Sequence, residues 1–466
     1  MKKLVALFGL DDKNALNTAL DKFFYSFKYP ALIALLAVFS FVTKMQMGCY
    51  AIFLALTSVL LVMQRDATPI LPLLIFFITM FRDLSVTGSL LFYLMLIPLV
   101  VCLIIHFIKF PPIPFCFGKL FLPLLAVTTA LFAGGLMSPY ISDYVKGLLY
   151  ILPLGPGLTL IYLYFNNYLR PPENFDSKKY LCLLLMLLGL VCTLEFIFYY
   201  YNYYYLQNNL FSIAELGWAN VNGIGSLILL SIPATCYLFV KSKSITIWSV
   251  IILLFYFTIF STKSDASLGI SVTFLPFMVF IVYKKLSKHK RNMFFILLCA
   301  IGVCVCLACI ALTLTGKMQE IIDKILKAFQ SDSGRSKLYR DALSVFLENP
   351  LFGGGMGYYN DHILQTTTAL RNFNFHSTFF TVIGCMGMFG FLAYVYYFHA
   401  RYKILIECNT SFNVFMFIAF TMFVCHGFID TSEFSTIPQM IVATIIMLIT
   451  DLTNTKGNES SLPLAF

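Results

Sequence analysis

Long apolar stretches separated by short polar ones run along almost the whole chain. Most of these stretches approach the 20 or so residues that a helix needs to cross the hydrocarbon core of a bilayer. We count fourteen of them, beginning near residues 29, 47, 69, 87, 119, 144, 180, 220, 245, 268, 293, 375, 412 and 436. The pattern predicts an all-α polytopic membrane protein with about 14 transmembrane helices.

One long interval, residues 315–374, interrupts this pattern. We find no soluble domain and no internal repeat, so we predict a single membrane domain over residues 1–466 that contains this interval as a long loop. A loop of this length inside a compact domain usually has structure or function of its own. The loop is therefore the first place to look for a site.

Part of this loop, "SDSGRSKLYRDALSVFLENPLFGGGMGYY", predicts an amphipathic helix followed by a sharp turn. The helix is expected to begin after the serines at 331–333 and to end before Pro350. Four glycines between 353 and 357 then allow a tight turn. The apolar positions share one helical face, and they are Leu338, Ala342, Val345 and Phe346.

Composition and charge support this topology. The chain is 59% hydrophobic and 12% charged, with a mean hydropathy of +0.84. Positive loops stay on the cytoplasmic side, and fourteen spans with the N-terminus inside place 21 of the 32 Lys and Arg residues there. The net charge of +10 then mostly reflects membrane topology, and it gives no reason to expect a nucleic-acid partner. The long loop falls on the outer side.

Several charged groups are expected at this outer side. Cations at a membrane face suggest an anionic ligand, and the planar fork of arginine suits phosphate. The alternative is ordinary solvated loop charge. The candidates are the cations Lys263, Arg335, Arg340 and Arg371, with His376 and the acids Asp430 and Glu433.

His376 stands at the head of the apolar stretch "NFHSTFFTVIGCMGMFG". Ionisable groups that enter a span are costly, so they are candidates for function. A histidine there could act as a general base or as a phosphate-binding donor; a hydrogen-bonded structural histidine is the alternative. The outer segments contain no Asp-x-Asp pair and no zinc-spaced His/Cys cluster, so we expect no metal and no cofactor.

Four short motifs, taken in order, resemble the O-antigen ligase and polymerase superfamily of bacterial polytopic glycosyltransferases. "FHSTFFTVIGCMGMFG" is similar to its histidine followed by two glycines, and "SGRSKLYRDALSVFLENPLFGGGMGYY" to its Arg-x-x-x-aromatic helix and Pro-x-x-Gly-x-Gly turn. "STKSDASLGISV" and "WANVNGIGSLILL" resemble a basic step and an asparagine at the outer starts of two earlier spans. The resemblance covers roughly residues 215–390.

The resemblance implies an enzyme of the bacterial inner membrane with its active site on the periplasmic or extracellular side. A glycan carried on undecaprenyl diphosphate would be transferred, with inversion and without metal, to an acceptor sugar hydroxyl. His376 and Arg335 would be catalytic, and the diphosphate or substrate would be bound by Arg340, Lys263, Tyr339, Arg371 and Asn222. Its partners would be the lipid-linked glycan, the bilayer and, as a further candidate, a chain-length regulator.

Two positions depart from the family pattern. The arginine expected after Ser264 is Asp265, so Lys263 is expected to supply the charge, and the asparagine expected after the histidine is Ser377. The acceptor is also left open. We favour a surface-polysaccharide polymerase because the chain has fourteen predicted spans rather than about twelve. The alternative is an O-antigen ligase that transfers the glycan to lipid A-core. A lipid-linked oligosaccharide flippase is a further alternative, against which stand the scarcity of charge within the spans and the lack of inverted repeats.

Overall fold

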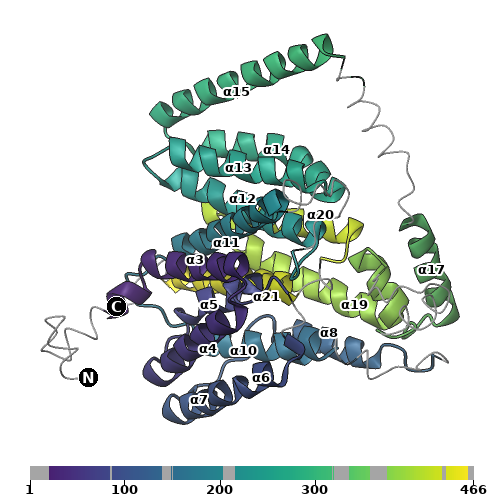
Figure 1. Cartoon of the computed structure of the whole chain (residues 1–466). Coiled ribbons are helices and arrows are strands. Elements are labelled where there is room, and N and C mark those ends of the chain that lie inside the picture. Colours follow the sequence, from purple (N-terminus) through teal and green to yellow (C-terminus); the bar gives the residue numbers. More distant parts are fainter. Residues whose placement is uncertain are drawn as a thin grey trace, which may run out of the picture.

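The structure is a computed structural model. It describes residues 20–83, 87–138, 151–202, 216–316, 335–356, 375–432 and 437–459, with the single positions 148 and 319. Every regular secondary-structure element within these ranges is a helix, so the predicted all-α class is confirmed. In Figure 1 most of the helices lie side by side in one bundle.

The N-terminal part of the bundle contains shorter helices. They are α3 (Lys28–Thr43), α4 (Gln46–Met63), α5 (Ile70–Phe76) with the 3-10 turn Ile78–Met80, α6 (Leu90–Leu94), α7 (Leu96–Lys109), α8 (Phe121–Ala133), the π turn Pro153–Gly157, α10 (Leu158–Tyr168) and α11 (Ser177–Tyr200). The C-terminal part contains longer helices. They are α12 (Val221–Lys241), α13 (Thr246–Thr262), α14 (Asp265–Lys285), α15 (Lys288–Leu314), α17 (Arg335–Glu348), α19 (Thr378–Ile406), α20 (Ser411–Ile429) and α21 (Ile437–Glu459).

Among the described residues, seven helices are long and apolar enough to cross a membrane. They are Gln46–Met63, Leu90–Lys109, Ser177–Tyr200, Val221–Lys241, Asp265–Lys285, Thr378–Ile406 and Ser411–Ile429. The protein is thus a helical membrane protein. The finer prediction of fourteen spans is not confirmed, although a helix lies in or near each predicted stretch. The stretch at 69–81, for example, holds only the short α5 and a 3-10 turn, because its apolar run ends at Arg82.

The helix α12 lies at the centre of the bundle, since 94% of its apolar 18-residue stretch is buried. It runs antiparallel to α20: Tyr237 near its end contacts Phe412 and Phe415 at the start of α20, at ring distances of 5.6 and 6.3 Å. The start of α12 therefore lies beside the end of α20. We call this end of the bundle, where α12, α14 and α19 begin and α13 and α20 end, the α17 end, because α17 lies there beside α19 (Figure 1).

The helix α19 is interrupted at Gly387, which has φ 64° and ψ −155°. A break frees backbone groups that would otherwise bond within the helix, and such groups need partners inside a bundle. The glycine-rich turn after α17 supplies them. Gly354 N–H donates to Gly384 O and Gly355 N–H to Cys385 O, at 2.8 and 2.9 Å.

The same turn also accepts hydrogen bonds on the other side of the break. Met388 N–H donates to Pro350 O at 2.8 Å, and Phe389 N–H donates to Leu351 O at 3.1 Å. The approach is so close that a Cβ at Gly387 would lie 2.5 Å from the Leu351 carbonyl carbon. The predicted helix and glycine turn of the long loop are therefore confirmed, and together they are locked into α19.

Candidate active site

His376 lies two residues before α19, at the α17 end of the bundle. Its backbone is in the left-handed region, with φ 47°, a conformation that non-glycine residues seldom adopt and that often occurs at functional sites. Ser377 follows as the N-cap of α19, and its side chain accepts from Phe380 N–H. Serine and asparagine are both favoured at an N-cap, so the departure from the family pattern preserves the capping of α19. The His376 side chain remains 27% exposed.

The nearest charged group to this histidine is Asp430, which follows α20. The His376 Nδ1 atom lies 3.5 Å from Asp430 Oδ1, and the carboxylate side chain is only 5% exposed. The backbone reinforces the contact, because Thr378 N–H donates to Asp430 O at 3.3 Å. The start of α19 and the end of α20 are thus joined at the histidine.

The Asp430 carboxylate is held in its charged form. Burial alone would raise its pKa, but the interaction with His376, the nearby His426 and the Thr431 N–H together lower the pKa of Asp430 to about 2. The Thr431 N–H donates to Oδ1 at 2.7 Å. A buried, ionised carboxylate beside a histidine fixes the ring orientation and favours a proton on the nitrogen that faces it.

The helix α17 brings a cation to the same place. Arg335 is its first residue. One turn later the Tyr339 ring stacks on Phe380, with centroids 4.3 Å apart, and the Tyr339 hydroxyl donates to His376 O at 3.4 Å. Burial raises the pKa of Tyr339, the charge of Arg335 opposes this rise, and Asp430 adds to it. Arg335, Tyr339, His376 and Asp430 therefore form one cluster.

Polar atoms without partners lie behind this cluster. His426 is 1% exposed, and its Nδ1 contacts Ser432 Oγ at 2.7 Å. Four of the buried atoms that have no hydrogen-bond partner within the described part of the chain lie next to this cluster: Thr378 Oγ1, Thr381 Oγ1, His426 Nε2 and Asp430 Oδ2. Such atoms are uncommon in folded proteins. A polar ligand bound at this place could supply the missing partners.

Lys263, Ser264 and Asn222 form a second group at the α17 end. Ser264 caps α14, and its hydroxyl donates to Asn222 Oδ1 at 2.7 Å. Lys263, with φ 56° and an exposed side chain, ends α13. Asp265 is the first residue of α14, where a negative charge favours the helix dipole. That local role explains an acid where the family pattern has arginine.

The remaining predicted residues fall in different places. Arg340 is exposed on α17, beside the cluster, and Arg371 and Glu433 lie outside the described residues. Sequence reasoning named Asp430 among the charged groups of this side but did not pair it with His376. No sequence signal links two residues that are 54 positions apart; only the packing of α19 against α20 brings them together.

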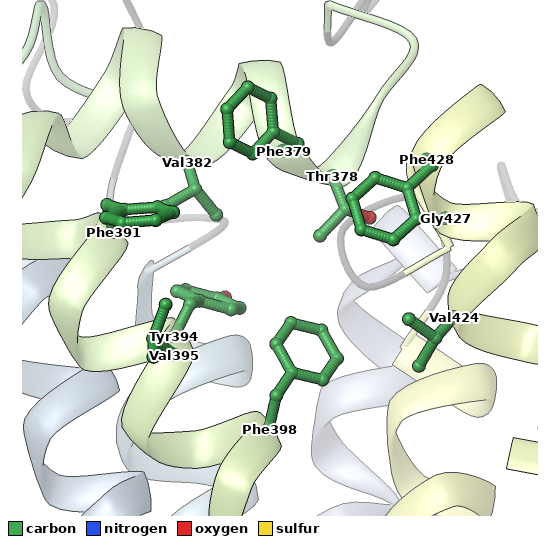
Figure 2. A pocket seen from close by; sticks show the side chains of 10 residues that line it. All are labelled: Thr378, Phe379, Val382, Phe391, Tyr394, Val395, Phe398, Val424, Gly427 and Phe428. Atoms are coloured by element: carbon green, nitrogen blue, oxygen red, sulfur yellow. The ribbon is translucent and has the colours of Figure 1, made fainter. Parts of the chain in front are cut away.

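An apolar cavity of about 130 Å³ opens beside the cluster, between α19 and α20 (Figure 2). Because α19 breaks at Gly387, residues from both of its halves face this cavity. Thr378 and Phe379 come from the first half and Phe391 and Tyr394 from the second, while Gly427 comes from α20. The polar cluster therefore adjoins an apolar surface within the bundle.

Fold and site together define a helical membrane protein with a charged, partly buried cluster at one end of its helices. Residues 248–395 match the family model described as O-antigen ligase. The match confirms, over this segment, the resemblance to the O-antigen ligase and polymerase superfamily, and the segment contains Arg335, Tyr339 and His376. Asp430 lies beyond it. No curated protein matches the chain.

Proposed function

We propose that this protein transfers a glycan from undecaprenyl diphosphate to an acceptor sugar hydroxyl at the outer face of the bacterial inner membrane. The observation that carries the proposal is the contact between His376 Nδ1 and the buried Asp430, 3.5 Å apart, beside the helix that begins with Arg335. Placing the α17 end outside follows from the positive-inside prediction.

The transfer is a single displacement with inversion. The acceptor oxygen bonds to the anomeric carbon as the bond from that carbon to the diphosphate oxygen breaks. Asp430 keeps a proton on Nδ1 of His376, so Nε2 is the nitrogen that takes the acceptor proton. General-base catalysis of this kind contributes about 10²–10⁴-fold to a rate.

The leaving diphosphate gains negative charge as the bond breaks. Arg335, at the N-terminal end of α17, is placed to neutralise that charge, helped by the N–H groups of the first helical turn. Lys263 and Arg340, at the same end of the bundle, add positive charge nearby. The family match supports this role, because the matched segment holds all three cations.

The cavity between α19 and α20 is suited to the first units of the donor's lipid chain. It is lined mainly by aromatic and aliphatic side chains (Figure 2), and one lining residue, Thr378, is bonded through its N–H to Asp430 of the cluster. A lipid chain there would hold its diphosphate next to the polar cluster. A site that combines apolar walls with a few polar groups is typical of small-molecule binding.

Two acceptors remain in competition. The family description favours a ligase, and lipid A-core as its acceptor stays a prediction. The preference for a polymerase, which transfers to another lipid-linked repeat unit, came from fourteen predicted spans and stays a prediction. A chain-length regulator as partner also stays a prediction.

The test is to incubate the purified protein with a lipid-linked repeat unit, with and without lipid A-core. Transfer only to the core indicates a ligase, and a ladder from the repeat unit alone indicates a polymerase. Excess EDTA is expected to leave the rate unchanged, since Arg335 and not a metal ion neutralises the leaving diphosphate. His376→Ala is expected to abolish transfer, and His399→Ala, which alters an exposed histidine of α19, is the matched control. A failure to form any glycosidic product with native protein would refute the proposal.

A further inference from the structure

The helix α15 stands apart from the rest of the bundle (Figure 1). Its contacts with α12 lie near its first turns. The Phe294 ring lies 5.6 Å from that of Phe239 at the end of α12, and the Lys290 ammonium donates to Ser242 O. From this attachment α15 diverges, so one side of α13 and α14 is only partly covered.

A groove of about 340 Å³ lies between α15 and the other helices. Four helices line it, each over the same length of eight residues: 232–239 of α12, 249–256 of α13, 275–282 of α14 and 294–301 of α15. A helix advances 1.5 Å per residue, so the groove runs for about 10 Å along the helices. The inner half of a hydrocarbon core is about 15 Å deep. The groove therefore matches much of the length of one acyl chain.

Cations surround the end of this groove that lies opposite the α17 end. Lys241 lies two residues beyond the lining residue Phe239, and Lys284 and Lys285 lie two and three residues beyond Val282. Arg291 lies three residues before Phe294, and its guanidinium is 4.9 Å from the Tyr283 ring. The sequence has no acidic residue from 236 to 250 or from 278 to 298. These two stretches of the chain therefore carry only positive charge.

We infer that the groove between α15 and α12–α14 binds one anionic phospholipid of the inner leaflet. An acyl chain fills the groove, and the phosphate headgroup lies among the lysines at the connections between α12 and α13 and between α14 and α15. The positive-inside rule explains the cations alone, but not an apolar groove that begins one helical turn from them on three helices. Basic pockets between membrane helices on the cytoplasmic side are known to take anionic headgroups. The inference uses the orientation proposed above and not the glycan chemistry.

Phosphatidylglycerol and phosphatidylcholine with the same acyl chains differ only in the headgroup. Comparing their binding therefore measures the effect of headgroup charge. Titration of each lipid into the detergent-purified full chain, followed by native mass spectrometry, should give one tightly held phosphatidylglycerol per chain. The side chains of Lys243, Lys285 and Lys288 are exposed and form no ion pair within the described ranges. Replacing all three by glutamine should weaken binding up to about 100-fold, since each lysine near an anionic surface contributes about a fivefold factor.

The groove is tested separately by filling it. Leu298→Trp places a large ring in the groove from the side of α15 and should weaken phosphatidylglycerol binding about tenfold. Ile296→Trp is the matched control, because Ile296 is 67% exposed on the same helix and does not line the groove. Lys178→Gln with Lys179→Gln, at the start of α11, is the control for charge. Equal binding of phosphatidylcholine, or unchanged binding in Leu298→Trp, would overturn the inference whether or not the protein transfers glycans.

Discussion

Tyr339 stacks on Phe380, with their rings 4.3 Å apart and their planes 13° from parallel. The stack joins the helix that carries Arg335 to the first turn of α19, next to His376. The two catalytic candidates, far apart in the chain, are thus held in one geometry by an aromatic pair.

Removal of this stack should loosen the site without unfolding the bundle. An aromatic pair contributes about 0.5–1.5 kcal/mol beyond its buried area, so Tyr339→Ala is expected to lower kcat/KM for glycan transfer up to about tenfold. Tyr339→Phe keeps the stack and should stay close to the native value. Equal losses in the two variants would show that the hydroxyl, and not the ring, is what matters.

Arg335 is expected to act on the leaving diphosphate in the transition state. Loss of one such preorganised donor typically lowers kcat by about 10²–10³-fold, and we expect this of Arg335→Gln. Arg335→Lys should recover only part of the rate, because lysine lacks the two-pronged donor. Lys337→Gln, an exposed cation of the same helix, is the control. A native rate in Arg335→Gln would remove this residue from the mechanism.

Asp430 is expected to position His376 without touching the sugar. Asp430→Asn keeps the shape of the side chain but can leave the histidine proton on the wrong nitrogen, so kcat should fall about 100-fold or more while KM changes little. Steady-state kinetics on a lipid-linked donor measures both constants. Glu348→Gln, which alters an exposed acid at the end of α17, should have no effect. A change confined to KM would argue for a role in binding instead.

The same carboxylate should make stability depend on pH. Its pKa is lowered from 3.8 to about 2 in the folded protein, so its stabilisation is present above about pH 4 and disappears as the pH falls toward 2. The full contribution is about 2 kcal/mol. Native protein should therefore have a higher Tm than Asp430→Asn at pH 6, and the gap should narrow between pH 4 and 2. A gap that does not depend on pH would contradict the assigned ionisation.

Gly387 should be required for folding. An added Cβ would meet the Leu351 carbonyl carbon at 2.5 Å, and the left-handed backbone there adds strain, so Gly387→Ala is expected to cost about 1–3 kcal/mol. Gly269→Ala is the control, because a Cβ at Gly269 meets nothing within 4 Å and alanine favours a helix. Thermal unfolding in detergent would compare them. A native Tm in Gly387→Ala would mean that the turn can move away.

The sequence predicted where helices form, but neither the number of spans nor how the helices pack against one another. Apolar runs located helices such as α12 and α20, because burial in a bilayer depends mainly on local composition. The helix of the long loop followed from its periodicity and from Pro350. The number of spans did not follow: the run at 69–81 is apolar enough for a helix but too short for a crossing.

At the candidate site, the motifs located Arg335 and His376 but not what holds them. Asp430 is fixed to His376 by the packing of α19 against α20, a relation that no local pattern encodes. Gly387 was read as part of a signature, and its neighbours gave no sign that a remote turn completes the hydrogen bonds of the helix. The groove beneath α15 depends on the angle of that helix, which composition does not determine.

The docking of the glycine turn into α19 also bears on biogenesis. Translation delivers residues 350–355 before residues 384–389, so the segment that fills the break emerges from the ribosome ahead of the helix that needs it. The amides of Met388 and Phe389 and the carbonyls of Gly384 and Cys385 find their partners only when this turn packs against α19. Completion of the hydrogen bonds of α19 thus depends on a segment that is synthesised before it.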